Sequence, residues 1–244
     1  MQSLIVVPTY NEARNVPELA AQLFALGLPD LHILVVDDNS PDGTADVAEG
    51  LNGTFPGRLH VLRRAAKEGL GKAYVAGFKE ALRLGAGNVI QMDADLSHPP
   101  SAVPRLLEAL ETSDVAVGSR YIEGGGAVEE WGLLRKLISR GGDIYVRAVL
   151  GLPIQDTKSG FKAFRREVLE NVGLDQLASA GYIFQAEFVF RCHKMGYRMR
   201  EVPFVFQERR AGKSKMSVGI LVEALWRSVW LRMKTRAIPR QVKT

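Results

Sequence analysis

Short apolar runs alternate with longer amphipathic segments through the first half of the chain. The runs have the length and residue types of β-strands, and the longer segments follow helical spacing. The expected strands are residues 4–7, 32–36, 59–62, 89–92 and 114–117, and the expected helices are residues 12–26, 43–50, 71–84 and 100–110. Because continuously apolar strands are separated by helices, we predict an α/β fold, a mostly parallel sheet with helices on both faces.

Clusters of polar residues follow four of the expected strands, at the point where each strand ends. The clusters are Pro8-Thr9-Tyr10-Asn11-Glu12, Asp37-Asp38-Asn39-Ser40-Pro41-Asp42-Gly43-Thr44, Asp93-Ala94-Asp95 and Gly118-Ser119-Arg120-Tyr121. Parallel α/β sheets bind their ligands at the carboxyl ends of the strands. We therefore predict that the clusters converge on one edge of the sheet. Taken alone, Asn11 could be a helix cap, and residues 39–43 could be a turn that begins a helix.

Two carboxylates, Asp93 and Asp95, end the fourth expected strand, with the small Ala94 between them. Side chains alternate between faces in extended backbone, so both carboxylates can point the same way. Like charges that close repel each other unless a cation joins them, and Mg²⁺ or Mn²⁺ takes oxygen ligands. Mg²⁺ is usually shared with substrate phosphates, which indicates a diphosphate. The alternative interpretation is a strand end followed by an Asp-capped turn.

Composition narrows the class of protein. A chain of 244 residues can form one large α/β domain or two small ones. The single cysteine, Cys192, excludes an intrachain disulfide and a cysteine-based metal cluster, and we expect it to be a buried small residue. The excess of 32 basic over 27 acidic residues is mild, which suits anionic small molecules or a membrane surface and does not predict nucleic-acid binding.

Sequence motifs test several other classes of protein. Residues 69–73 lack the flanking residues of a phosphate-binding P-loop, and no Gly-x-Gly-x-x-Gly fingerprint is present. The segment 33–40 is similar to the opening of a phosphoacceptor receiver domain, although a full strand and helix precede it. The amino terminus lacks the features of a signal peptide, and no apolar run reaches the approximately 20 residues that span a bilayer. We therefore expect a cytoplasmic protein.

In this order, the clusters resemble those of the family-2 glycosyltransferases with the GT-A nucleotide-sugar fold, most closely the polyprenyl-phosphate (dolichyl-phosphate) mannose synthases. Other matching segments are Met92 to His98, Arg135 to Gly141, Gln155 to Phe161 and Ser214-Lys215. The resemblance runs from residue 4 to about residue 220. It implies one catalytic domain over residues 1–215, with a donor half at about 1–120 and an acceptor half at about 121–215, followed by an amphipathic helix and basic tail over 216–244.

The resemblance also implies roles on the donor side. Residues that hold the base and ribose of a nucleotide correspond to Pro8, Tyr10, Glu12, Val36 and Asp38. The diphosphate and a Mg²⁺ or Mn²⁺ cofactor correspond to Asp93, Ala94 and Asp95, with Asp93 and Asp95 as metal ligands and Asp95 as the more direct one. Arg120 is a further donor-binding residue, and Arg209 and Lys215 correspond to cations of a donor-closing loop that can neutralise the leaving diphosphate.

On the acceptor side, the resemblance matches Arg120, Arg135 and Ser139 to residues that bind a lipid phosphate. If the segment from Leu133 is helical, Arg135 and Ser139 lie one turn apart on one face. A solvated basic helix face is the alternative. Asp95, Arg120 and Asp156 are the expected catalytic residues, and Asp156 could position either the sugar or an arginine.

The implied reaction moves mannose from GDP-mannose to a polyprenyl (dolichyl) monophosphate and inverts the anomeric centre. A phosphate monoester, whose second pKa is about 6, is already ionised near neutral pH, so no strong general base is required. Polyprenyl-phosphate glucose synthases that use UDP-glucose share most of these motifs. A non-catalytic nucleotide-sugar binding or regulatory module is the rival from another class.

Near the carboxyl end, apolar residues recur at helical spacing. The stripe consists of Val218, Leu221, Val222, Leu225, Trp226, Val229, Trp230 and Met233, with basic residues beside it. Such a helix can pack on its own domain, lie on a membrane or bind a partner. Since the implied acceptor is lipid-linked, we expect a peripheral enzyme at the cytoplasmic face of a membrane, with a small membrane-anchoring partner as an open alternative.

Overall fold

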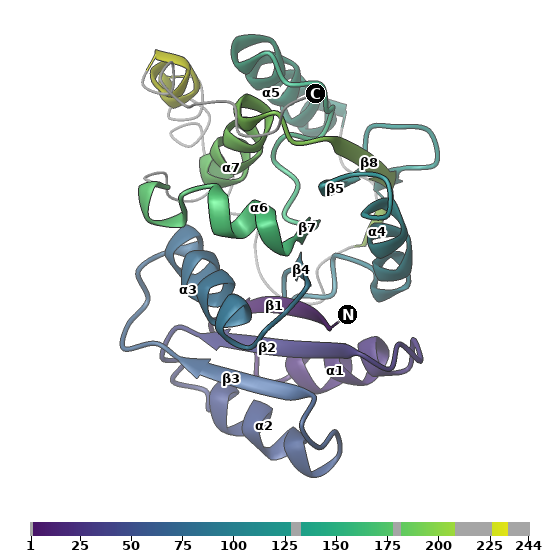
Figure 1. Cartoon of the computed structure of the whole chain (residues 1–244), viewed down its shortest axis with the longest axis vertical. Coiled ribbons are helices and arrows are strands. Elements are labelled where there is room, and N and C mark those ends of the chain that lie inside the picture. Colours follow the sequence, from purple (N-terminus) through teal and green to yellow (C-terminus); the bar gives the residue numbers. More distant parts are fainter. Residues whose placement is uncertain (1, 128–132, 178–181, 208–225, 234–244) are drawn as a thin grey trace.

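A seven-stranded sheet forms the centre of the protein (Figure 1). The computed structural model describes residues 2–127, 133–177, 182–207 and 226–233. The strand order is β3-β2-β1-β4-β7-β5-β8, and β6 pairs with β9 in a separate small sheet. The strands are β1 (Ser3–Thr9), β2 (Leu31–Asp37), β3 (Leu59–Arg63), β4 (Asn88–Gln91), β5 (Val115–Ser119), β6 (Gly126–Ala127), β7 (Lys162–Arg165), β8 (Met199–Pro203) and β9 (Val205–Phe206).

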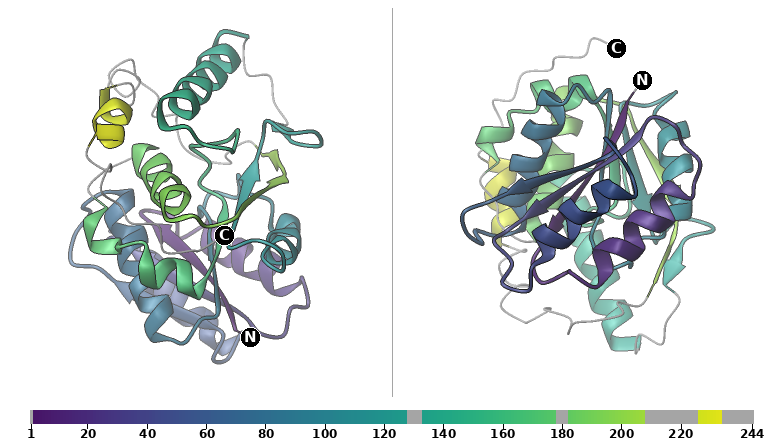
Figure 2. Two further views of the ribbon diagram at one scale, coloured as in Figure 1. Left: turned by 45° about the horizontal axis from the view of Figure 1, so that its top comes forward. Right: turned by 90° about the horizontal axis from the view of Figure 1, so that it is seen from below.

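Helices cover both faces of this sheet, as the sequence predicts (Figure 2). One face carries α1 (Asn15–Phe24), α2 (Thr44–Gly50) and α4 (Val103–Ala109); the other carries α3 (Leu70–Arg83), α5 (Leu133–Leu150), α6 (Arg166–Asn171) and α7 (Tyr182–Met195). Short 3₁₀ turns are η1 (Leu51–Gly53), η2 (Pro100–Ala102) and η3 (Leu174–Gln176). The protein is therefore a three-layer α/β structure.

Alternation along the central strands explains the two layers of core. In β1, Leu4 and Val6 face the α3 layer, whereas Ile5 and Val7 face the α1 layer. Helix α3 approaches β1 and β2 closely because it carries Gly77 at the contact. A methyl group at Gly77 would lie 2.4 Å from Val6 Cγ1. The glycine therefore sets the distance between α3 and the strands that lead into the predicted donor clusters.

Among the strands that the sequence analysis did not predict, β7 departs most from the expected parallel pattern. Strand β7 is antiparallel to both neighbours and lies between β4 and β5. Its four residues include two cations, Lys162 and Arg165, so the apolar pattern that identifies the other strands is missing. Because β7 is antiparallel to both β4 and β5, these two strands run parallel to each other and end at the same edge of the sheet. The predicted convergence of the four clusters is confirmed.

The carboxyl-terminal helical segment, residues 226–233, packs differently from the predicted stripe. Leu231, which lies outside that stripe, is fully buried in the α3-side core, and Trp230 packs partly against it. Trp226 and Met233 from the stripe are exposed. Most of the described part of the stripe therefore faces outward, while the side that carries Leu231 joins the domain with Trp230 at its border. Among the described residues, no helix is both long and apolar enough to cross a membrane. Cys192 is buried, as expected.

Candidate active site

The loops that follow β1 and β2 brace each other at the edge of the sheet. The backbone N–H of Asn11 donates to Ser40 Oγ at 3.0 Å, and that of Glu12 donates to Thr44 Oγ1 at 2.9 Å. Ser40 Oγ in turn donates to Asp37 Oδ1 at 2.5 Å, and Thr44 Oγ1 donates to Asp42 Oδ1 at 2.5 Å. The turn at residues 39–43 thus does more than begin α2: its side chains fix the β1 loop that carries Tyr10 and Glu12.

The predicted base and ribose residues lie beside two cations that the sequence analysis did not select. Asp38 forms an ion pair with Arg64, and both side chains are nearly buried. Burial raises the pKa of Asp38, and Arg64 opposes that change. The Nζ atom of Lys67 lies 3.5 Å from the ring centroid of Tyr10. Both cations come from the β3–α3 connection, so this loop belongs to the predicted nucleotide side of the site.

Two other predicted donor residues belong to the braced strands themselves. Pro8 and Val36 lie opposite each other in the β1–β2 register. The Val36 side chain is fully buried in the core. The structure therefore offers no exposed surface of Val36 for the predicted donor contact.

The carboxylates of Asp93 and Asp95 lie just beyond β4, where each is held by a hydroxyl. Tyr74 donates to Asp93 Oδ1 at 2.8 Å, and Ser97 Oγ donates to Asp95 Oδ1 at 2.5 Å. Both aspartates are partly exposed, while Ala94 between them is buried. Strand β4 ends at Gln91, so a bend, rather than extended strand, presents the two carboxylates at the surface.

A third carboxylate, Glu12, belongs to the same acidic centre. Burial raises the pKa of Glu12, and the negative charges of Asp95, Asp42 and Asp93 raise it further, against a hydrogen bond from Asn15. A cluster of like charges of this kind favours a bound cation. In the described part of the chain, no group of three or more His, Cys, Asp or Glu side chains is arranged to hold a metal by itself.

A pair of carboxylates fits a metal that takes its other ligands from elsewhere. Mg²⁺ and Mn²⁺ prefer oxygen, and Mg²⁺ is usually bound through one or two carboxylates together with substrate phosphates. Asp93 and Asp95 supply only oxygen donors. The nearby His98 ring is engaged elsewhere: its Nδ1 accepts the Asp93 backbone N–H at 3.2 Å, and the ring stacks on Phe161. The residues present therefore fit a divalent cation shared with a diphosphate.

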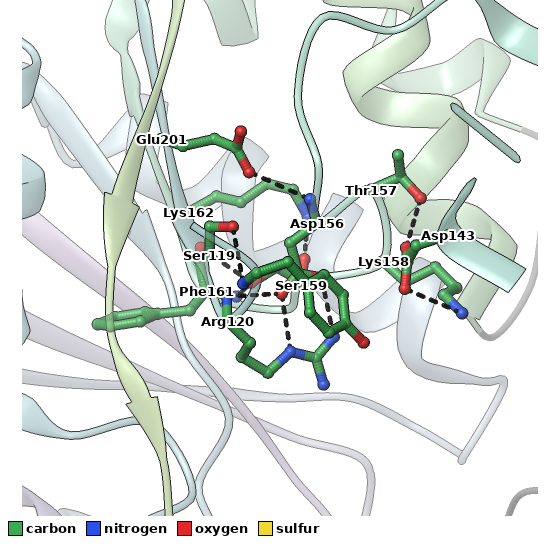
Figure 3. A network of polar contacts seen from close by, with 11 residues as sticks. Ser119, Arg120, Asp143, Asp156, Thr157, Lys158, Ser159, Phe161, Lys162 and Glu201 are labelled. Atoms are coloured by element: carbon green, nitrogen blue, oxygen red, sulfur yellow. Dashed lines mark hydrogen bonds and ion pairs between the residues drawn. The ribbon is translucent and has the colours of Figure 1, made fainter. Parts of the chain in front are cut away.

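The Arg120 and Asp156 side chains form a buried bidentate ion pair (Figure 3). Arg120 Nε donates to Asp156 Oδ2 at 2.7 Å, and Nη2 donates to Oδ1 at 2.8 Å. The Arg120 backbone N–H also donates to Oδ2, at 3.1 Å. Asp156 is fully buried, and the Arg120 side chain is 14% exposed. Of the two roles left open for Asp156, the geometry supports positioning an arginine.

The turn that carries Asp156 is anchored to two further elements. The Asp156 backbone N–H donates to Glu201 Oε1 on β8 at 3.1 Å. Thr157 Oγ1 donates to Asp143 Oδ1 on α5 at 2.7 Å, and Lys158 pairs with the other oxygen of Asp143 at 3.2 Å (Figure 3). The turn thereby links the end of β5 to α5, the helix on which the predicted acceptor residues lie.

Some predicted residues are located only in part. Arg135 and Ser139 both lie in α5, so they are one helical turn apart as expected, and their side chains lie outside the described residues. Arg209 and Lys215 fall wholly outside the described residues. The sequence analysis missed Arg64, Tyr74, Asp143 and Glu201, which are distant in sequence from the clusters they support. No local pattern marks them.

Comparison with known proteins places the chain in a family. Residues 4–173 match glycosyl transferase family 2. An undecaprenyl-phosphate mannosyltransferase from Micrococcus luteus is 45% identical over 225 residues, covering 92% of this chain and 91% of that protein. A polyprenol monophosphomannose synthase from Mycolicibacterium smegmatis is 43% identical over 227 residues, covering 93% and 85%, respectively.

The fold has a matching solved structure as well. A mannosyltransferase from Pyrobaculum calidifontis, determined in complex with GDP-Man and Mn²⁺, superposes with a TM-score of 0.66 at 21% identity, covering 98% of this chain and 66% of that chain. At that identity the likeness concerns the fold alone. The family match excludes the receiver-domain interpretation of residues 33–40. The chain belongs to glycosyl transferase family 2 and has the GT-A fold.

Proposed function

We propose that this protein transfers mannose from GDP-mannose to a polyprenyl (dolichyl) monophosphate, with inversion at the anomeric carbon. The observation that carries the proposal is the meeting of a carboxylate pair and a buried, bidentate arginine at one edge of the sheet. The first suits a nucleotide diphosphate with its metal, and the second suits an anionic acceptor. The names of the two relatives at 45% and 43% identity support the same donor sugar and acceptor class.

On the donor side, Asp93 and Asp95 would hold Mg²⁺ or Mn²⁺, which would supply positive charge to the leaving diphosphate when bound. Tyr74 and Ser97 keep the two carboxylates in place through their hydroxyl groups. Tyr10 offers an aromatic face to the base, and Glu12 and Asp38 offer acceptors for ribose hydroxyls. We assign Arg209 and Lys215 to the closing of the donor site, in line with the family pattern.

On the acceptor side, Arg120 orients the phosphate of the lipid. Asp156 uses only Nε and one proton of Nη2, which leaves the two Nη1 protons for a phosphate oxygen. Arginine suits this task because its planar fork matches phosphate geometry. The acceptor is already ionised near neutral pH, so the chemistry depends on placing two anions close together and does not require a strong general base. Arg135 and Ser139 on α5 would complete the phosphate contacts.

We further propose that the protein works as a peripheral enzyme at the cytoplasmic face of a membrane. The acceptor of such a reaction carries a hydrocarbon tail. Exposed apolar side chains gather on two helical segments of the acceptor half and the carboxyl end: Ile144 on α5, and Trp226, Val229 and Met233 on residues 226–233. Exposed tryptophan with flanking basic residues favours the interface between lipid and water. A small membrane-anchoring partner remains the alternative means of docking.

A donor screen tests the proposed reaction. Purified protein, Mn²⁺ or Mg²⁺ and a short polyprenyl phosphate are incubated with GDP-mannose or with UDP-glucose, and lipid-linked product is measured by mass spectrometry. The proposal predicts product from GDP-mannose that disappears in chelator. Product from UDP-glucose alone would replace mannose by glucose in the assignment. Tight GDP-mannose binding without any product would favour a non-catalytic binding module.

A further inference from the structure

A fully buried lysine lies beneath the site and has no part in the roles assigned so far. Lys162, on β7, is 0% exposed. Its Nζ donates to the backbone carbonyl of Ser159 and, at 2.7 Å, to Gln185 Oε1 on α7. Lysine is almost never completely buried without partners, because its charge is costly to remove from water. A position of this kind therefore calls for a specific explanation.

The carbonyl that Lys162 binds belongs to the turn at residues 156–160 (Figure 3). This turn lies beside both halves of the site. At one end of the turn, Asp156 holds Arg120 by two hydrogen bonds. At the other end, Gly160 packs against the donor side: a methyl group there would lie 3.3 Å from Asp93 Oδ2 and 3.3 Å from His98 Cε1. A shift of this turn would therefore move the predicted acceptor arginine and press on the predicted metal carboxylate.

We propose that Lys162 is a positioning residue that fixes the turn at residues 156–160 and so sets the separation of Asp93, on the donor side, from Arg120, on the acceptor side. The terms donor side and acceptor side rest on the proposed function. Lys162 acts through the Ser159 carbonyl and touches neither substrate. Its attachment to Gln185 ties the turn to α7, a buried helix of the α3-side core, which is rigid compared with a surface loop.

The charge of the ammonium group also matches its surroundings. Burial lowers the pKa of Lys162 to about 7, while the carboxylates of Asp156 and Asp93 act in the opposite direction and favour the charged form. The same two carboxylates stand at the two ends of the turn. An uncharged side chain at this position would leave the Ser159 carbonyl and the Gln185 amide oxygen without this donor, and buried acceptors that lose their donor destabilise the local structure.

The test compares Lys162→Met, which keeps an unbranched side chain as far as Cε and removes the charge and donors, with Lys162→Arg, which keeps the charge and the donors. The matched control is Lys79→Met, a lysine whose ion pair with Asp175 is largely exposed. A misplacement of reacting groups by about 1 Å can cost on the order of 100-fold in rate, so we expect kcat of Lys162→Met to fall by about 10- to 100-fold. The KM for GDP-mannose with Mn²⁺ should rise by up to about tenfold, and Lys162→Arg should recover most of both losses.

A binding measurement gives a second readout that does not depend on turnover. Calorimetry of GDP is run with Mn²⁺ and in chelator on wild type and on Lys162→Met. Since Gly160 lies beside the Asp93 carboxylate, we expect the variant to bind GDP about tenfold more weakly than wild type with Mn²⁺ and equally well in chelator. If Lys162→Met does not fold, Gln185→Met removes one Lys162 partner at similar volume and should lose kcat by about three- to tenfold.

The two proposals fail in different ways. A wild-type protein that makes no mannosyl lipid defeats the proposed function, and the Mn²⁺-dependent GDP comparison then still decides the role of Lys162. A folded Lys162→Met variant with wild-type kcat and wild-type Mn²⁺-dependent affinity would overturn the positioning role. The positioning role would also be overturned if activity fell only in proportion to the amount of folded protein and GDP affinity fell equally with and without Mn²⁺.

Discussion

The Arg120–Asp156 pair allows a worked prediction for the substitution Asp156→Asn. The change keeps the shape of the side chain, removes its charge and replaces one accepting oxygen by an NH₂ group that faces the guanidinium. Asp156 is 0% exposed and Arg120 is 14% exposed, so water cannot fully replace the lost oxygen. Removing one partner of a buried ion pair typically costs about 3–5 kcal/mol of unfolding free energy.

The lower end of that range applies here, because asparagine keeps one carbonyl oxygen and the arginine retains some contact with solvent. A loss of about 3 kcal/mol corresponds to a decrease in Tm of about 6–12 °C for a chain of this size, at about 2–4 °C per kcal/mol. Arg120 would also lose its fixed orientation. We therefore expect kcat to fall by about 100-fold at a temperature where the variant is folded.

Thermal unfolding followed by circular dichroism measures the first effect, and steady-state kinetics below the Tm measure the second. The control is Asp175→Asn, which removes an exposed ion pair with Lys79 and should leave both values close to wild type. An Asp156→Asn protein with a Tm within about 2 °C of wild type and an unchanged kcat would refute the positioning role of Asp156.

Three further predictions concern other parts of the chain. Arg135→Ala should raise the KM for polyprenyl phosphate several-fold and leave the KM for GDP-mannose nearly unchanged; the opposite pattern in steady-state kinetics would contradict its acceptor role. Gly77→Ala should lower the urea midpoint because its methyl group meets Val6, whereas Gly141→Ala, which has open space, should raise stability by about 0.5–1 kcal/mol. Burial lowers the pKa of His32 and of His60, whose ring nitrogens are 3.2 Å apart, so the unfolded chain binds more protons just below about pH 6.5. The free energy of unfolding should therefore fall as the pH decreases below about 6.5. The double variant His32→Gln/His60→Gln should show a weaker dependence of this free energy on pH, measured by urea titrations at several pH values.

Much of the fold could be predicted because the first five strands are mostly apolar and each of the first four is followed by a helix. The same order of strand and polar cluster located Asp93, Asp95 and Arg120 at one edge. Strand β7 could not be predicted, since its four residues carry two cations and its pairing between β4 and β5 depends on contacts far along the chain. Hydrophobic periodicity has no signal for such a strand.

The partners of the site residues were also beyond reach of the sequence. Arg64 meets Asp38 across 26 positions, and Asp156 meets Arg120 across 36. Only the turn between α5 and β7, brought beside β5 by the tertiary fold, explains why Asp156 serves an arginine. In the carboxyl-terminal segment, periodicity predicted a helix but left open what its apolar stripe packs against; among the described residues, Leu231 is buried and Trp226 is exposed.

The most direct test of the central claim is the identity and stereochemistry of the product. Purified protein is incubated with Mn²⁺, a short polyprenyl phosphate and GDP-mannose labelled with ¹³C at the anomeric carbon, and the reaction is followed by ¹³C and ³¹P NMR. We expect a β-linked mannosyl phosphodiester that forms with wild type and is nearly absent in chelator or with Asp95→Ala. An α-linked phosphodiester, or release of free mannose without lipid-linked product, would contradict it.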